Sequence, residues 1–453
     1  MPNKNDEIEL YIDGCGYEGE GVGRFDGMAV FVPYAAKGDT ALVRIVKTAK
    51  THMFGKLMSV ITPSESRAEA PCPVYGKCGG CSFMHLKYEK QLEYKRERVA
   101  DCIKKICRSG EIEVLPVIPS DKQFFYRNKV QLPIGTNARS EPVCGFYAPH
   151  SHRIVPCADC MLQDRSMKKA VDAFLIWMKE NGISAYNEEN GKGLVRHIFL
   201  RCGEFEGKSQ LVFMPVITSE RLPKADSLEK CLKTAGVTSL CVNINKVRTN
   251  VILGDKTYVI YGDGYIKDVL LGNTFKISPQ SFYQVNKPQA EKLYRAALDM
   301  AEIKKTDTVY DLYCGAGTIT LSAAAYAAHV YGIEIVEEAV KNAKENAIAC
   351  GIDNVTFLAG DVAKTVRELK ETAPPDIVIL DPPRKGCSSD TLELIKELFP
   401  EKIVYVSCNP ATLARDMEYL IKNGYTAGSV QPVDLFPQTA HIETITLLQR
   451  QDM

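Results

Sequence analysis

Three segments near the C-terminus carry side chains that could take part in chemistry. Cys408 lies in Ser-Cys-Asn-Pro after an apolar run, Asp381 opens Asp-Pro-Pro-Arg after another, and Glu443 closes the polar segment 434–443. A thiolate is a nucleophile, and a carboxylate is a general base. Together they could activate a pyrimidine ring carbon. Uracil C5 attacks a sulfonium methyl only after a thiolate has added to C6, and a base must then remove the C5 proton.

The same residues also have simpler interpretations. Cys408 could be a buried, inert cysteine at the end of a strand, and Glu443 could be a solvated glutamate. Asp-Pro-Pro alone also occurs in amino-group methyltransferases, whose target nitrogen is already nucleophilic and needs no cysteine. The presence of a cysteine and a carboxylate beside this motif is what favours a ring-carbon target.

A glycine-rich segment, Asp311-Leu-Tyr-Cys-Gly-Ala-Gly-Thr318, follows a strand-like run and opens a helix-like one. Its glycines let the backbone come close to a nucleotide-like ligand. Glu334 ends the next expected strand, where it can bind two ribose hydroxyls, and Asp361 ends the third, where it can meet an adenine amino group. The third glycine of a dinucleotide fingerprint is replaced, which favours S-adenosylmethionine over NAD. The alternative is a glycine turn that only packs the helix on the strand.

Cys72, Cys78 and Cys81 place three soft ligands within a short, glycine-containing segment. A fourth thiolate is absent locally, and Cys157 and Cys160 are the obvious donors. Four thiolates suit either zinc or a [4Fe-4S] cluster, and the spacing does not choose the metal.

The elements that must position these residues differ along the chain. From residue 288 onward, strand-like and helix-like runs alternate, which predicts an α/β, doubly wound parallel sheet with ligands at the carboxyl ends of its strands. Residues 8–60 are short β-like runs with glycine turns, typical of a small barrel. Residues 112–285 are β-rich and irregular and predict an α+β middle domain. The segment Lys87–Arg108 predicts an amphipathic helix, with one apolar face made of Leu92, Val99, Ile103 and Ile106.

Composition limits the class of protein. With 453 residues, 45% hydrophobic and 25% charged, the chain is predicted to be a multidomain globular protein. Lys+Arg 56 balance Asp+Glu 56, so local basic patches, such as that on the barrel, would have to hold a nucleic acid. No apolar run approaches membrane length and no export signal is visible. A soluble, cytoplasmic protein is therefore expected, whose 16 cysteines stay reduced.

Six ordered motifs resemble the RNA uracil-5-methyltransferase family, closest to its ribosomal branch: CPVYGKCGGCSFMHL, SPQSFYQVN, DLYCGAGTITL, VILDPPRKG, VSCNPATLARD and DLFPQTAHIET. The resemblance covers nearly the whole chain. It implies a TRAM-type, OB-like barrel that binds RNA (1–60), matched by GYEGEGVGR and AVFVPYAAKGD. It further implies a middle domain carrying an iron–sulfur cluster (61–281) and a Rossmann-like class I methyltransferase domain (282–453). The helix near 88–112 is expected to pack on the catalytic domain.

The resemblance also implies roles for single residues. Cys408 would be the nucleophile that adds to uracil C6, Glu443 the base that takes the C5 proton, and Phe282 the ring that stacks on the flipped target base. The residues expected to contact S-adenosylmethionine are Gln284, Tyr313, Glu334 and Asp381, with Thr318 and Asp361 as lesser candidates. The expected ligands of the [4Fe-4S] cluster are Cys72, Cys78, Cys81 and Cys160, with Cys157 as the alternative to Cys160.

The resemblance therefore implies S-adenosylmethionine-dependent methylation of C5 of specific uridines in 23S ribosomal RNA by a monomer with no membrane partner. Because methyl transfer has no redox step, the cluster is expected to have a structural or RNA-positioning role. Two other classes stay open. One is a redox enzyme, although the radical type uses CxxxCxxC, whereas five and two residues separate the cysteines of this chain. The other is a noncatalytic RNA-binding or assembly factor.

Overall fold

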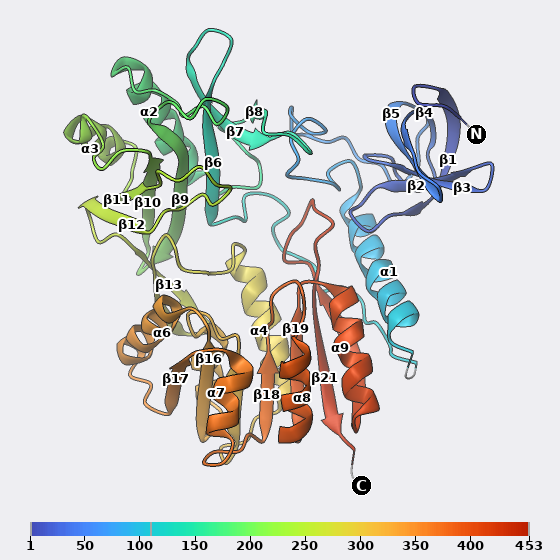
Figure 1. The fold of residues 1–453 in the computed structure, drawn as a ribbon, viewed down its shortest axis with the longest axis vertical. Helices are drawn as coiled ribbons and strands as arrows, with labels where there is room; N and C mark the ends of the chain where they lie inside the picture. Colours follow the sequence, from blue (N-terminus) through green and yellow to red (C-terminus); the bar gives the residue numbers. More distant parts are fainter. Residues whose placement is uncertain (1, 109–110, 452–453) are drawn as a thin grey trace.

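The N-terminal part of the computed structural model, which describes residues 2–108 and 111–451, is a closed barrel. Its five strands follow the order β1-β2-β3-β5-β4 (Figure 1). Alternate apolar side chains fill the interior, so Ile12, Val30 and Val43 have no exposed surface. The predicted barrel is confirmed. Its strands are β1 (Glu7–Cys15), β2 (Gly21–Phe25), β3 (Met28–Val32), β4 (Thr40–Thr48) and β5 (His52–Thr62).

The middle region is a mixed sheet of seven strands in the order β12-β11-β10-β9-β6-β7-β8. Two helices, α2 (Ser166–Glu180) and α3 (Ala225–Thr234), pack against it, and Phe174, Trp177 and Phe213 form an aromatic group in this core. The strands are β6 (Lys129–Thr136), β7 (Pro142–Tyr147), β8 (Ile154–Pro156), β9 (Val195–Phe205), β10 (Lys208–Ile217), β11 (Ser239–Ile244) and β12 (Lys256–Tyr261). A separate hairpin of β13 (Ile266–Leu270) and β14 (Asn273–Ile277) leads to the C-terminal region.

The C-terminal region is a second seven-stranded sheet, in the order β17-β16-β15-β18-β19-β21-β20, with helices on both faces. Its strands are β15 (Thr308–Leu312), β16 (His329–Glu334), β17 (Val355–Ala359), β18 (Ile377–Leu380), β19 (Lys402–Ser407), β20 (Tyr425–Val433) and β21 (Glu443–Arg450). Its helices are α4 (Lys287–Ala301), α5 (Thr318–Ala324), α6 (Glu337–Cys350), α7 (Val362–Leu369), α8 (Ser389–Leu398) and α9 (Pro410–Lys422).

The predicted doubly wound parallel sheet is confirmed for its five strands β15 to β19, and one side of the sheet is antiparallel. β15 to β19 are parallel, but β21 pairs antiparallel with both β19 and β20. A parallel crossover needs a connection of a dozen or more residues, usually through a helix. Residues 434–442 between β20 and β21 contain no helix, so the chain returns as a hairpin, and β21 enters the sheet in the reverse direction.

Helix α1 (Tyr88–Ile106) joins the barrel side of the molecule to the catalytic sheet by packing on α9 and β20. Its Val99 and Ile103 are buried, as predicted, but Ile106 at the end of the helix is 37% exposed. Lys95 and Asp434 form an ion pair at 2.5 Å in which both side chains are fully buried. Residues 109–110 of the helix expected near 88–112 lie outside the described residues.

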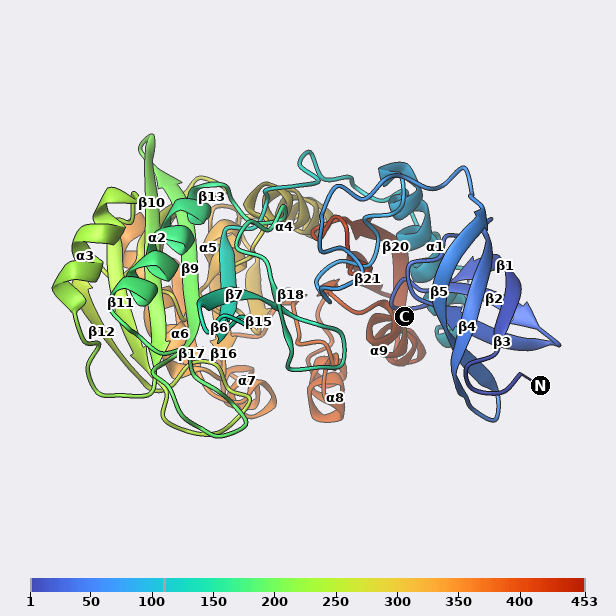
Figure 2. The same ribbon diagram turned by 90° about the horizontal axis from the view of Figure 1, so that it is seen from above.

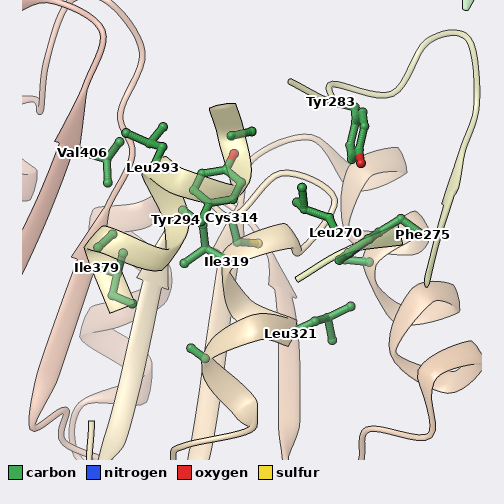
Figure 3. Packing of buried hydrophobic residues seen from close by; sticks show 14 of the residues in the cluster. Leu270, Phe275, Tyr283, Leu293, Tyr294, Cys314, Ile319, Leu321, Ile379 and Val406 are labelled. Carbon is green, nitrogen blue, oxygen red and sulfur yellow. The ribbon is translucent and has the colours of Figure 1, made fainter. Parts of the chain in front are cut away.

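The carboxyl ends of the parallel strands in the catalytic sheet face the side of the molecule that holds the barrel and the middle sheet (Figure 1). The barrel and the middle sheet lie at opposite sides of the molecule in Figure 2, and both lie beyond the end of the catalytic sheet at which the parallel strands finish in Figure 1. Within the catalytic region, Tyr294 of α4 packs beside Cys314 and Ile319 (Figure 3). No helix among the described residues is long and apolar enough to cross a membrane.

Candidate active site

Cys408 and Glu443 lie beside each other at the carboxyl edge of the catalytic sheet. β19 and β21 pair antiparallel with Ser407 opposite Thr444, whose hydroxyl donates to the Ser407 carbonyl at 2.9 Å. Cys408 directly follows β19, Glu443 is the first residue of β21, and the charge of Glu443 acts on the Cys408 thiol. The fold therefore brings the predicted nucleophile and the predicted base together.

Asp381, which follows β18, completes a group of three interacting acids. Burial, followed by the charges of Glu443 and Asp381, raises the pKa of Cys408 to about 11, and Arg384 opposes this shift. Burial and then Asp381 raise the pKa of Glu443 well above its ordinary value. Burial and then Asp311 raise the pKa of Asp381 to about 7. A carboxylate with a raised pKa is a stronger base, so Glu443 is suited to removing a proton from carbon.

The predicted cofactor residues gather at the same edge. Leu312 of β15 pairs with both Ile333 of β16 and Leu380 of β18, so Tyr313, Glu334 and Asp381 occupy neighbouring strand ends. The Glu334 carboxylate accepts the backbone N–H groups of Gly315 and Val336 at 3.1 and 2.9 Å.

The glycine loop needs glycine for a steric reason. Gly317 has a φ of 82°, and a Cβ built there would lie 2.8 Å from the Phe357 ring. The backbone can therefore turn closely over the strand ends only without a side chain.

The hydrogen-bond acceptors at the carboxyl ends of these strands fit S-adenosylmethionine. Glu334 offers carboxylate oxygens at the second strand end, where ribose hydroxyls are bound in such sheets. Asp361 caps α7 through one oxygen, which accepts Lys364 N at 3.1 Å, and this exposed residue has a second oxygen for a ligand. The buried Oδ1 of Asp311 has no hydrogen-bond partner. These carboxylates can accept hydrogen bonds from a nucleoside, and the glycine loop lets the ligand approach the backbone closely.

Tyr294 is a site residue that sequence reasoning missed. It is buried on α4, and the side chains of Thr318 and Gln284 lie close enough to its hydroxyl to lower its pKa. Burial, followed by the charge of Asp381, raises the pKa of Tyr294 far above its ordinary value. Tyr294 therefore lies close to two predicted cofactor residues from different segments and to Asp381. Because it lies on the apolar face of a helix, its sequence position indicates only a core residue.

Phe282 and Gln284 lie on the loop between β14 and α4. Phe282 is 65% exposed, which is unusual for a phenylalanine and leaves its ring free to contact a ligand. Asn128 holds this loop from the middle region: its side chain donates to the Gln284 carbonyl at 3.0 Å, and its backbone N–H donates to the Val285 carbonyl at 2.9 Å.

The predicted metal ligands lie in a different place from the catalytic group. All five relevant cysteines line one cavity of about 230 Å³: Cys72, Cys78, Cys81, Cys157 and Cys160. Within the described ranges, no three His, Cys, Asp or Glu side chains are grouped so that they could hold a metal ion. A hydrogen bond from Cys157 lowers the pKa of Cys160 to about 7. The structure thus gathers the predicted thiols without forming a ready-made ion site.

Two cations line the same cavity. Arg127 and Lys129 face it, and no carboxylate is among its described lining residues. Lys129 stands directly opposite Arg201 in the pairing of β6 with β9. Burial, followed by the charges of Arg201 and Arg127, lowers the pKa of Lys129 to about 8. Buried cations without carboxylate partners are costly, so the cavity is electrostatically suited to an anionic occupant.

Comparisons with known proteins give one consistent assignment. Residues 242–451 match the family described as tRNA (Uracil-5-)-methyltransferase, and residues 3–58 match the TRAM domain. An uncharacterised RNA methyltransferase of Clostridium acetobutylicum is 43% identical over 454 residues, covering 99% of this chain and 98% of the relative. One from Halalkalibacterium halodurans is 41% identical over 450 residues, with coverages of 99% and 98%.

A solved structure is also similar over its whole length. The tRNA (uracil-54, C5)-methyltransferase of Pyrococcus abyssi, in complex with S-adenosyl-L-homocysteine, superposes with a TM-score of 0.79 at 26% identity. The match covers 97% of this chain and 100% of that one.

Proposed function

Because this chain belongs to the RNA uracil-5-methyltransferase family, we propose that it methylates C5 of specific uridines in 23S ribosomal RNA through a covalent adduct on Cys408. The observation that supports the mechanism is that Cys408 follows β19 and Glu443 opens the adjacent β21, so that the charge of Glu443 acts on the Cys408 thiol. S-adenosylmethionine, when bound, supplies an electrophilic methyl group. Gln284, Tyr313, Glu334 and Asp381 would hold it, with Thr318 and Asp361 as further contacts.

The reaction begins at C6 of the uracil ring. The Cys408 thiolate forms a bond to C6, and the electron pair of the C5–C6 double bond becomes available at C5 and O4. C5 then bonds to the methyl carbon as the bond from that carbon to the sulfonium sulfur breaks, and S-adenosylhomocysteine leaves with the electron pair on its sulfur. Glu443 removes the remaining C5 proton, the double bond re-forms, and the bond from sulfur to C6 breaks to release the Cys408 thiolate. No electrons are gained or lost in this sequence.

The target base must leave its helix for this chemistry. C6 is covered by neighbouring bases in a stacked strand, so the uridine has to be flipped out. An exposed aromatic ring can offset part of the cost of unstacking, and we assign this role to Phe282. Basic side chains on the barrel surface would hold the RNA backbone, and those classed as exposed are Arg24, Lys37, Lys47, Lys50 and Lys56.

We place a [4Fe-4S] cluster in the cysteine cavity, bound by Cys72, Cys78, Cys81 and Cys160. Four thiolates would hold either such a cluster or a zinc ion, and the cluster would need the larger space. The cavity volume of about 230 Å³ and the cations Arg127 and Lys129 support a large anionic occupant. Asn128 lies between these two cations in the sequence, and its side chain donates a hydrogen bond to the Gln284 carbonyl in the loop that also carries Phe282. This link fits a structural role for the cluster.

The ligand assignment is tested with two cysteine variants of the reconstituted protein. Cys78→Ser is expected to lose iron and cluster absorbance, whereas Cys157→Ser is expected to keep both. Retention of the cluster in Cys78→Ser would refute the ligand set, and loss in Cys157→Ser with retention in Cys160→Ser would exchange the fourth ligand. If metal analysis of the native protein finds zinc and no iron, the cluster assignment is refuted and the cysteines form a zinc site.

The activity is tested by tritium release from 23S ribosomal RNA labelled at C5 of uridine. Wild-type protein with S-adenosylmethionine is expected to release tritium, and Cys408→Ala and Glu443→Gln are expected not to. RNA binding without tritium release by the wild type would indicate a noncatalytic RNA-binding factor. Release from transfer RNA but not from 23S RNA would change the substrate. Mapping of 5-methyluridine by mass spectrometry in a deletion strain then identifies the uridine. The cytoplasmic location and the monomeric state stay predictions.

A further inference from the structure

A cavity of about 250 Å³ lies directly against the predicted nucleophile, and six separate segments build it. Cys408 and Asn409 form one wall, and the turn between β1 and β2 of the barrel forms another. The remaining walls come from the cysteine segment, α1, the segment after β18 that carries Arg384, and the loop before β21. We call this cavity the barrel-tip pocket. Since a cavity of about 150 Å³ already holds benzene, this one can hold a larger chemical group.

Tyr17 at the tip of the barrel is tied to the catalytic strand end. Its hydroxyl donates to the Asn409 Oδ1 at 2.8 Å, although the two residues are 392 positions apart in the sequence. The Arg98 guanidinium of α1 lies over the Tyr17 ring, 3.7 Å from its centre. This cation–π contact and the hydrogen bond fix the barrel turn beside the residue that follows the nucleophile.

The pocket carries two arginines without an ion-pair partner among the described residues, and the charge of Arg384 also acts on the neighbouring Cys408 thiol and Glu443 carboxyl. Among the described residues, ion pairs of arginine involve Arg44, Arg67 and Arg415, so Arg98 and Arg384 of the pocket have none. Arg98 Nη1 donates to the Ala440 carbonyl at 2.5 Å, but its buried Nε has no hydrogen-bond partner.

Other titratable groups at the pocket do not cancel this charge. The single carboxylate among the described lining residues is that of Glu18, which is solvent-exposed. Desolvation, followed by the charges of Arg384 and Arg98, lowers the pKa of the lining residue His441 to about 4. An imidazole with this pKa is neutral at physiological pH, so two arginines dominate the pocket.

We propose that the barrel-tip pocket binds a phosphodiester group adjacent to the target uridine, with Arg98 and Arg384 as its ligands. This inference rests on the proposed function, because a uridine bonded to Cys408 must continue as a strand past Asn409. The planar guanidinium matches phosphate oxygens through paired hydrogen bonds. Tyr17 is a positioning residue, since its ring orients Arg98. The barrel would then complete the nucleophile pocket as well as hold distant RNA.

The test uses a uridine-containing stem–loop of 23S ribosomal RNA that the full-length protein binds, and tritium release from the same RNA is measured separately. A set of RNAs each carries one uncharged methylphosphonate, at each linkage around the target uridine, with the neighbouring 2′-hydroxyl methylated in every RNA compared. Binding to the full-length protein is measured by fluorescence anisotropy at fixed salt. Wild-type protein is expected to lose about tenfold in affinity at one linkage adjacent to the target, since one charge-assisted contact is removed.

The variants decide whether Arg98 and Arg384 read that phosphate. In Arg98→Gln and in Arg384→Gln the penalty at this linkage should shrink toward onefold, while penalties at other linkages stay. Lys104→Gln, on the exposed face of the same helix and outside the pocket, should keep the wild-type pattern. Tyr17→Ala should reduce the penalty, and Tyr17→Phe, which keeps the ring under Arg98, should retain most of it.

The outcomes separate this inference from the proposed function. If wild-type protein releases tritium but both arginine variants keep the full penalty at every linkage, the phosphate site is refuted and the methyltransferase stands. If the phosphate penalty behaves as expected but no tritium is released, the proposed chemistry fails while the phosphate site is retained. Arg384 is exposed, so its replacement should fold even if Arg98→Gln does not.

Discussion

The ionisation of Cys408 gives a quantitative test of the site. Burial and two carboxylates raise the pKa of its thiol from an ordinary 9.0 to about 11. At pH 7 this leaves about one thiolate in ten thousand, about a hundredfold fewer than at the ordinary pKa. The free enzyme is therefore expected to have an unreactive nucleophile, which protects it from alkylation until substrate is bound.

Replacing Glu443 by glutamine removes the second-largest cause of this shift. The pKa of Cys408 in Glu443→Gln should fall below 11 but stay above 9.0, because burial, the largest cause, is unchanged. At pH values below the pKa of Cys408, lowering that pKa by one makes the thiolate fraction, and hence the alkylation rate, about tenfold higher. Asp381→Asn should act in the same direction with a smaller effect, because Asp381 ranks after Glu443 among the causes.

The assay is the rate of alkylation of Cys408 by iodoacetamide as a function of pH. Short exposures are read by peptide mass spectrometry, because the chain has 16 cysteines. Glu371→Gln, at an exposed position just beyond α7, serves as the control and should match wild type. A wild-type inflection at or below pH 9.0, or identical profiles for wild type and Glu443→Gln, would refute the proximity of Glu443 to Cys408.

Three further predictions concern stability and cofactor binding. Lys95→Met leaves the fully buried Asp434 carboxylate without its ion-pair partner and should lower the free energy of unfolding in urea by about 3–5 kcal/mol. Lys105→Met breaks an exposed pair and should have little effect. Equal effects of the two substitutions would contradict the burial of the first pair. Glu334→Gln should weaken binding of S-adenosylhomocysteine about tenfold in calorimetry, because a charged acceptor is lost, while the exposed neighbour Glu338→Gln should bind normally. Burial raises the pKa of Asp311 to about 7, so the folded chain retains a proton that the unfolded chain loses above about pH 4, and the free energy of unfolding should fall as pH rises across that window. Asp311→Asn should flatten this fall between about pH 4 and 7, and an unchanged slope would contradict the shift.

The cofactor edge could be predicted because parallel strands end at a common edge. Tyr313, Glu334 and Asp381 each follow or end an apolar run, and the order of such runs is enough to place them near one another. The antiparallel return of β21 could not be predicted in the same way. Its alternation resembles any other buried strand, and only the short connection after β20 makes the reversal necessary.

Contacts between segments that are distant in the chain could not be predicted from the sequence. Tyr17 lies in a turn whose glycines identify a barrel, but nothing in its pattern indicates a hydrogen bond to Asn409. Lys95 lies on a helix rich in basic residues and is indistinguishable by pattern from its solvated neighbours, yet it is fully buried against Asp434. Such pairs depend on how the barrel, α1 and the catalytic sheet dock, and residue periodicity records only which face of each element is apolar.

The most direct test of the central claim is the intact mass of the protein after incubation with S-adenosylmethionine and RNA containing 5-fluorouridine at the target. Fluorine at C5 cannot be removed as a proton by Glu443, so the reaction should stop after methyl transfer. We predict a species with the mass of protein, RNA and one methyl group, attached through Cys408 and absent from Cys408→Ala. An adduct that persists in Cys408→Ala, or methylated RNA with no covalent species in the wild type, would contradict the mechanism.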